Sequence, residues 1–169
     1  ATMLDTTFEG RSWDRICFMF PHIAGKGRIS LNRELLAGFF RAAEPVLSPG
    51  GTVEVALVAG QGGTAADGDA RRDYGNTWQA ATQAAESGLV LVNTAPFDAK
   101  AWNDRGYVSR GHWRSRPESQ ERSFTVRDGV VHMFRREGEL EGKTCLSHAL
   151  TYTRDVSMWI TGAQMFSEE

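Results

Sequence analysis

The chain has 169 residues, of which 41% are hydrophobic and 24% are charged, and its formal net charge is −2. This length and composition predict one globular domain with a packed core. The near-neutral charge excludes a generally basic nucleic-acid-binding protein, so any contact with RNA must come from a local patch. Cys17 and Cys145 lie outside any Cys/His cluster, which excludes a disulfide scaffold and favours an intracellular protein. No apolar run reaches the roughly 18 to 20 residues of a membrane-spanning helix, so no membrane partner is expected.

The first part of the chain predicts a strand, a helix and a second strand. Segment 14–20 is short, apolar and ended by Pro21, as in a strand buried within a parallel sheet. Apolar residues then recur every four positions from Leu31 to Leu47, which predicts a helix that Ser48-Pro49-Gly50-Gly51 would end. The β-branched segment 52–58 predicts the next strand. The three elements together indicate a right-handed parallel crossover.

The second part of the chain has weaker patterns. A helix is expected to begin near Thr77 and to stop at Gly88, followed by a strand at 89–92. No periodic pattern is visible from 93 to 122, and a stretch of this length is too long for a simple connector, so it is expected to be functional or mobile. A strand-like pattern returns at 124–134, with Asp128-Gly129 as a turn signal.

Two glycine clusters follow predicted strands. Gly25-Lys26-Gly27 lies where a phosphate-binding loop would sit, but the third glycine of that fingerprint is absent, which favours a basic turn. Gly60-Gln61-Gly62-Gly63-Thr64 lies at the carboxyl end of a strand, where open α/β sheets place ligands, although a flexible loop is the favoured interpretation. The histidines and cysteines show no metal-ligand spacing, so no metal is expected.

An arginine-rich segment without acidic residues extends from position 105 to position 116. Its arginines are interleaved with aromatic side chains, and its candidate RNA-binding residues are Arg105, Tyr107, Arg110, Trp113, Arg114 and Arg116. Such a mixture can hold phosphates and stack on unpaired bases. The alternative is a solvated loop whose tryptophan packs against the domain. The residues alone leave both interpretations open.

Several motifs between residues 3 and 136 resemble those of the 25S ribosomal RNA (uridine-N(3))-methyltransferases. The resemblance rests on the sequence WDRICFMFPH at 13–22, NRELL at 32–36, GGTVEVAL at 50–57, GQGGT at 60–64 and NTWQ at 76–79. It implies a Rossmann-like class I methyltransferase sheet with helices on both faces, of which residues 1–136 would form the carboxyl-terminal half. S-adenosylmethionine would then be the methyl donor, and the N(3) atom of a ribosomal uridine the acceptor.

The resemblance also implies roles for individual residues. Phe20, Pro21 and His22 would lie at the target base, with Phe20 stacking on it and His22 accepting its proton or a hydrogen bond. Asp5 and Thr6 match a turn near the adenine of the cofactor, and Phe20 would contact the cofactor as well. The family's glycine-rich first strand would precede residue 1, so this chain alone is expected to be inactive and not to bind the cofactor.

The C-terminal segment resembles a different module. Residues 152–159 are similar to the opening strand of the anticodon-binding domain of phenylalanyl-tRNA synthetase. We therefore expect a linker at 137–144 and the start of an anticodon-binding domain of the ferredoxin fold at 145–169. This feature keeps a second function open, that of a non-catalytic module without cofactor that binds rRNA or tRNA. The expected location is the nucleolus or the cytoplasm.

Overall fold

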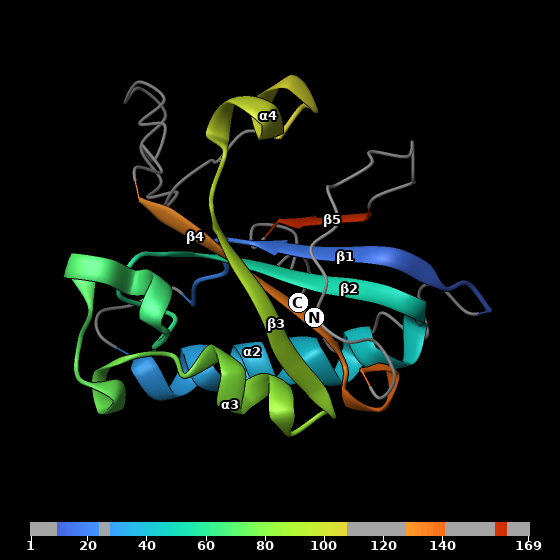
Figure 1. Ribbon diagram of the computed structural model, residues 1–169, viewed down its shortest axis with the longest axis horizontal. Coiled ribbons are helices and arrows are strands. Elements are labelled where there is room, and N and C mark those ends of the chain that lie inside the picture. Colours follow the sequence, from blue (N-terminus) through green and yellow to red (C-terminus); the bar gives the residue numbers. More distant parts are fainter. Residues whose placement is uncertain (1–9, 24–27, 108–127, 141–157, 162–169) are drawn as a thin grey trace, which may run out of the picture.

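The computed structural model describes residues 10–23, 28–107, 128–140 and 158–161, which form an α/β fold. Its sheet has five strands in the order β3-β4-β2-β1-β5 (Figure 1). The strands are β1 (Trp13–Met19), β2 (Leu47–Val58), β3 (Leu89–Pro96), β4 (Gly129–Arg136) and β5 (Met158–Thr161). Helices α2 (Ile29–Ala43) and α3 (Ala80–Ala85) cover one face, and α4 (Ala99–Asp104) lies on the other. No helix in the described part is long and apolar enough to cross a bilayer.

The direction of the strands divides the sheet into two parts. β1 is parallel to both β2 and β5, so β1, α2 and β2 form the predicted parallel crossover. β4 is antiparallel to β2 and to β3, between which it lies. The strand predicted at 124–134 is confirmed from Gly129 onward, after Asp128, which has a φ of 65°. The predicted α/β sheet with helices on both faces is therefore confirmed.

The first helix ends earlier than its apolar spacing indicates. α2 stops at Ala43, a short 3-10 turn covers Glu44–Val46, and Leu47 already belongs to β2. Pro45 has no backbone N–H and cannot donate the next hydrogen bond of the helix, which favours the stop. The predicted helix terminator, Ser48–Gly51, lies inside β2, where the pairing with β1 shifts its register.

The predicted helix near Thr77 and the predicted strand at 89–92 are present, but their bounds differ from the prediction. α3 begins at Ala80 rather than near Thr77, and the chain leaves it at Gly88 with a φ of 69°. β3 continues to Pro96, and α4 follows within the segment where no pattern was visible. Asp98 caps α4, because its Oδ1 accepts the Ala101 N–H at 2.9 Å. A six-residue helix is too short to show a hydrophobic period, which explains why the sequence did not predict it.

Alternating side chains of β1 fill two apolar layers. Ile16 and Phe18 point to the α2 and α3 side, where the phenylalanines of the helix pack on them. Cys17 and Met19 point to the α4 side and pack with Trp102. Each fully buried large apolar side chain stabilises the fold by about 1.5 to 3 kcal/mol, so the two layers hold the end of β1 firmly in place.

β5 pairs with β1 along the edge of the sheet. The pairing joins Ile16–Met19 to Met158–Thr161 in parallel register. These four C-terminal residues therefore extend the sheet of the first part of the chain. The division into residues 1–136, a linker at 137–144 and a second domain at 145–169 stays a prediction.

Candidate functional site

The turn that follows β1 combines a left-handed residue with an exposed histidine. The Phe20 N–H donates to the Ala56 carbonyl at 2.9 Å, which continues the β1–β2 ladder by one bond. Phe20 has a φ of 49°, a conformation that costs a bulky side chain on the order of 1 to 3 kcal/mol. Pro21 is then buried and His22 is exposed. The turn therefore presents His22 to solvent at the carboxyl end of a central parallel strand, where such sheets place ligands.

The ring of Phe20 belongs to an aromatic cluster on the α4 side of the sheet. It meets the Phe97 ring edge to face at 4.8 Å, and Phe97 stacks on Trp102 at 6.0 Å. Phe20 itself is only half-buried. Part of this ring is therefore held by packing, and part remains open to a ligand.

Two neighbouring residues of α2 hold the segments around His22. The Asn32 side chain is buried, accepts the Ile23 N–H at 3.0 Å and donates to the Arg28 carbonyl at 3.0 Å. Arg33 donates to the Thr77 carbonyl from Nε at 3.0 Å and to the Gly75 carbonyl from Nη2 at 2.8 Å. The Asn-Arg pair of the NRELL motif thus fixes both the chain after His22 and the loop before Trp78.

The loop after β2 completes this arrangement. The Trp78 N–H donates to the Gln61 carbonyl at 2.7 Å, and the Ala80 N–H donates to the Gly62 carbonyl at 3.0 Å. The Trp78 ring lies 6.1 Å from the His22 ring. The segments that carry the FPH, NRELL, GQGGT and NTWQ motifs therefore meet at the carboxyl ends of β1 and β2, at one end of the sheet (Figure 1).

The interpretation of residues 60–64 as a flexible loop was wrong, because a buried aspartate holds this loop. The Asp67 carboxylate accepts the N–H groups of Gly60 at 2.9 Å, Gly63 at 2.8 Å and Thr64 at 3.1 Å. Thr64 and Asp67 also form a reciprocal capping box. The Thr-x-x-Asp spacing is a sequence signal for such a box and could have identified Asp67.

A buried histidine on β4 supports the same loop from below. His132 is fully buried, with Nε2 3.2 Å from the Thr64 hydroxyl and Nδ1 3.4 Å from the Val55 carbonyl. A carbonyl only accepts, so the neutral ring places its proton on Nδ1 and accepts the Thr64 hydroxyl at Nε2. Burial lowers the pKa of His132 below its usual value and keeps the ring neutral at physiological pH. No sequence pattern marked His132 as a support of this loop.

We expect acidification to destabilise the protein through His132. Its pKa is lower in the folded state than in the unfolded state, so the unfolded chain binds a proton first as the pH falls below about 6.5. The free energy of unfolding then drops until the folded pKa is reached, by about 1.4 kcal/mol for each unit between the two pKa values. Urea unfolding at pH 5.5 and 7.5 measures this loss, which His132→Gln should reduce. An equal loss in both proteins would contradict the role given to His132.

Gly62 lies directly against the His132 ring, and we expect Gly62→Ala to destabilise the protein. A Cβ at position 62 would lie 2.3 Å from Nε2 of His132, so the buried ring or the loop would have to move. Overpacking of this kind costs about 1 to 3 kcal/mol. Gly138→Ala is the matched control, because nothing lies within 4 Å of its Cβ position. Urea unfolding of both variants measures the loss of stability, and equal unfolding midpoints would contradict the close contact between Gly62 and the His132 ring.

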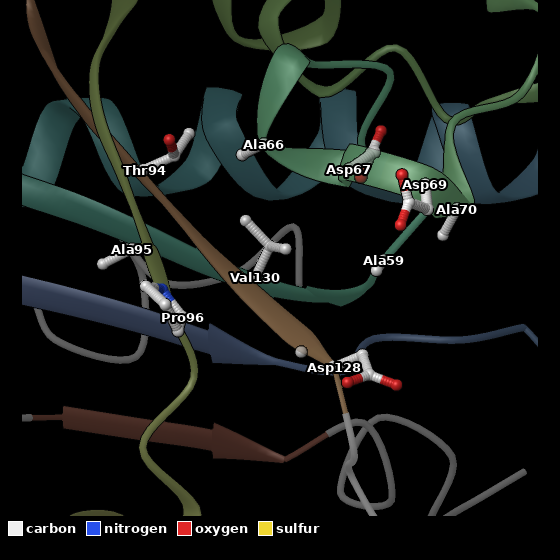
Figure 2. A pocket seen from close by; sticks show the side chains of 11 residues that line it. Ala59, Ala66, Asp67, Asp69, Ala70, Thr94, Ala95, Pro96, Asp128 and Val130 are labelled. Atoms are coloured by element: carbon white, nitrogen blue, oxygen red, sulfur yellow. The ribbon is translucent and has the colours of Figure 1, made fainter.

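A hollow of about 510 Å³ lies beyond the ends of β2 and β3 (Figure 2). Small side chains line most of it, together with Asp67, Asp69 and Asp128. None of the predicted site residues that the structure describes lines this hollow, and neither Phe20, Pro21 nor His22 contacts it. Across the described residues, no three His, Cys, Asp or Glu side chains are grouped to hold a metal ion.

Most candidate residues of the predicted RNA-binding segment lie outside the described part of the chain: Arg110, Trp113, Arg114 and Arg116. The predicted cofactor contacts Asp5 and Thr6 also lie outside it. Arg105 is described and lies 6.0 Å from the Trp102 ring. Tyr107 is buried against Trp102, and this position corrects its interpretation as a ring exposed for stacking on a base. Its packing under α4 instead holds the start of the arginine-rich segment.

Comparison with known proteins decides the family. Residues 1–111 match the family model described as rRNA (uridine-N3-)-methyltransferase BTM5-like. The chain belongs to this BMT5-like family. The family resemblance predicted from the sequence is confirmed, and all four motif segments that meet at the FPH turn lie within the matched range.

Two curated relatives of this BMT5-like chain are named ferredoxin-fold anticodon-binding domain-containing protein 1. The human protein is 42% identical over 143 residues, which are 83% of this chain and 22% of that protein. The mouse homolog is 39% identical over 126 residues, which are 75% of this chain and 19% of that protein. The chain thus spans about a fifth of the length of these relatives.

Two solved methyltransferase structures show a weak likeness to this family member. The M1.HpyAVI–SAM complex aligns with a TM-score of 0.40 at 12% identity, over 98% of this chain and 63% of that one. The 16S rRNA methyltransferase KamB aligns with a TM-score of 0.32 at 17% identity, over 73% of this chain and 55% of that one. These TM-scores are too low to carry an argument about function.

Proposed function

We propose that this chain supplies the target-base side of an S-adenosylmethionine-dependent methyltransferase that modifies uridine N(3) in large-subunit rRNA. The observation that carries the proposal is the FPH turn, in which Phe20 is held in a left-handed conformation and His22 is exposed at the carboxyl end of β1. Asn32 of the NRELL segment holds the residue after this turn, Trp78 of the NTWQ segment lies beside His22, and the GQGGT segment holds Trp78. Residues with an unfavourable backbone conformation such as that of Phe20 are concentrated at functional sites, where the position of a side chain matters.

The chemistry explains why a histidine and an aromatic ring are useful at this place. Uracil N(3) carries a proton and lies on the pairing edge, so the base must be unpaired or extruded before it can react. His22 would accept this proton, and Phe20 would orient the base by contact with its flat face. The bond from N(3) to the methyl carbon forms as the carbon–sulfur bond breaks, and His22 passes its proton to solvent. S-adenosylmethionine, when bound, supplies the electrophilic methyl group.

The described residues fit one part of this cofactor. The half-buried ring of Phe20 offers an apolar surface at the strand end, which suits contact with the cofactor's adenine. Asp5 and Thr6 would complete the contact, as the family pattern implies. The remaining cofactor contacts lie outside the residues that the structure describes.

Methyl transfer onto RNA tests the proposal directly. The protein, and any longer natural form that contains this chain, would be incubated with labelled S-adenosylmethionine and unmodified large-subunit rRNA. The RNA is then digested to nucleosides, which mass spectrometry identifies. We expect 3-methyluridine as the product. A longer form that binds the cofactor and the RNA but yields no 3-methyluridine, or methylates another atom, would overturn the proposal.

The second candidate is a non-catalytic module that binds rRNA or tRNA. The name of the human and mouse relatives, which includes an anticodon-binding domain, favours this alternative. It predicts RNA binding without methyl transfer and without cofactor binding. The same assay, accompanied by calorimetric titration with S-adenosylmethionine, separates the two candidates.

A further inference from the structure

We propose that four side chains near His22 bind the unpaired RNA strand on both sides of the target nucleotide. This group, the arginine rim, consists of Arg28, Arg71, Arg72 and Tyr74. The arginines would bind phosphates, and the tyrosine would stack on a neighbouring base. The inference deepens the proposed function and rests on it for RNA as the substrate.

Hydrogen bonds place Arg28 beside the FPH turn. The Arg28 carbonyl accepts the Asn32 side-chain amide, and Asn32 Oδ1 in turn accepts the Ile23 N–H. Ile23 directly follows His22. Arg28 is exposed just before the first residue of α2, so its side chain can reach a phosphate next to a base held at His22.

Packing places Arg72 and Tyr74 against the loop after β2, and Arg71 directly precedes Arg72 in the chain. Nε of Arg72 lies 3.2 Å from the position that a Cβ on Gly60 would take, and Cδ2 of Tyr74 lies 3.2 Å from that position on Gly63. The same loop binds Trp78, whose ring lies 6.1 Å from His22. The turns at 65–76 lie at the same end of the sheet as the start of α2 (Figure 1).

The three arginines of the rim form no ion pair within the described part of the protein. Arg28, Arg71 and Arg72 are exposed, and none of them takes part in the ion pairs of the described residues. The exposed acids in the same segment are Asp69 and Asp73. Asp67 in that segment is buried, and backbone N–H groups occupy its carboxylate.

A further cation lies beneath the rim. Among the described residues, Arg33 donates hydrogen bonds to the carbonyls of Gly75 and Thr77 and to no acidic side chain, so its positive charge adds to the rim. Over the two segments 28–34 and 65–76, four arginines therefore stand against three exposed acids, Glu34, Asp69 and Asp73. Such a local excess attracts phosphates although the whole chain is slightly acidic.

Tyr74 adds a fixed aromatic surface to these charges. Half of its surface is exposed, and its hydroxyl is hydrogen-bonded to the Thr82 hydroxyl. A ring held in this way loses little conformational freedom when a base stacks on it. Arginines combined with exposed aromatic rings are typical of single-strand binding. A single strand is also the form in which uracil N(3) is free, which agrees with the chemistry proposed for His22.

The test compares two double variants with the same change of charge. Arg71→Gln with Arg72→Gln removes two charges from the rim, and Arg11→Gln with Arg41→Gln removes two exposed charges at the opposite end of the strands. Fluorescence anisotropy with a uridine-containing single-stranded RNA, at several salt concentrations, measures affinity and salt dependence. We expect the rim variant to bind at least tenfold more weakly and its salt slope to fall by about 1.4, since each phosphate contact on a single strand contributes about 0.7. The control should bind within twofold of the unmodified protein.

Tyr74 gives an independent test. Tyr74→Ala should weaken binding by about tenfold, which corresponds to the loss of one stacked base, whereas Tyr74→Phe should retain most of the affinity. Urea unfolding of each variant shows whether the fold is intact. Equal weakening of RNA binding in both double variants, or tighter binding to duplex RNA than to a single strand, would contradict the proposed role of the arginine rim.

The outcomes also separate the rim from methyl transfer. If the rim variants lose RNA binding and a longer form that binds cofactor and RNA yields no 3-methyluridine, RNA binding by the rim is supported and the proposed reaction is overturned. If 3-methyluridine forms but the rim variants bind RNA as tightly as the unmodified protein, the reaction stands and the rim fails. A salt slope that changes only with Arg110→Ala and Arg114→Ala would likewise overturn the rim in favour of the arginine-rich segment.

Discussion

In a longer natural form that contains this chain, His22→Ala is expected to slow methyl transfer by about 100-fold or more, because a positioned proton acceptor contributes 10²- to 10⁴-fold to such reactions. The side chain is exposed and its ring lies 6.1 Å from that of Trp78, so urea unfolding of the variant is measured alongside to detect any loss of packing. Single-turnover rates at saturating RNA and cofactor measure the effect. Affinity for S-adenosylmethionine should change little, because His22 is assigned to the target base.

His22→Gln separates two roles of this histidine. Glutamine can form a hydrogen bond but cannot take up a proton at neutral pH. A slow His22→Gln protein therefore supports a proton acceptor, whereas a fast one indicates that His22 only orients the base. Lys100→Ala on the exposed surface of α4 is the control and should be fully active. Equal loss of turnover and of cofactor binding in His22→Ala would contradict the assignment.

Arg15→Met should lower the free energy of unfolding by about 3 kcal/mol, the lower end of the range for breaking a buried ion pair. Glu54 is buried on β2, and its Oε1 accepts Nε of Arg15 at 2.8 Å, with Nη2 at 2.7 Å. Within the described part of the chain, the partner of its other oxygen is the Cys17 thiol, a weak donor, at 3.9 Å. Burial raises the pKa of Cys17, so its side chain stays a neutral thiol that can offer Glu54 a weak hydrogen bond only. The side chain of Arg15 is partly exposed, which explains the choice of the lower end.

A second pair of variants shows whether the effect comes from the unpaired carboxylate. Adding Glu54→Leu to Arg15→Met should recover much of the lost stability, because no buried charge then remains. Lys100→Met breaks the exposed Lys100–Asp104 pair and should cost less than about 1 kcal/mol. Urea unfolding at pH 7 measures all three proteins. Equal losses in Arg15→Met and Lys100→Met would show that Glu54 is not effectively desolvated.

Local signals in the sequence were sufficient for the elements that carry the FPH turn. An apolar run ended by Pro21 predicted β1, and the β-branched run at 52–58 predicted most of β2, because strands buried on both faces need apolar residues at successive positions. The same short motifs predicted the family, since they follow one another in the family's order. The position of His22 after β1 followed from these local signals alone.

The junction between α2 and β2 is supported by a contact that no local pattern contains. Arg136 of β4 donates to the Glu44 carboxylate and to the carbonyls of Glu44 and Leu47. It satisfies backbone groups at the junction where the helix gives way to β2, a junction that the apolar spacing had placed later. The antiparallel direction of β4 likewise depends on its pairing with β2 and β3.

The support of the candidate site was also decided by tertiary structure. The sequence marked Gly60–Thr64 as a loop, but its order depends on His132, which lies 68 positions after Thr64 in the chain. Only the pairing of β4 beside β2 brings this histidine under Gly62. A residue's local sequence determines its preference for strand, helix or turn, whereas its hydrogen-bond partners depend on which distant segments fold against it. For this reason the position of His22 followed from the sequence, and the network that holds the site around it followed only from the fold.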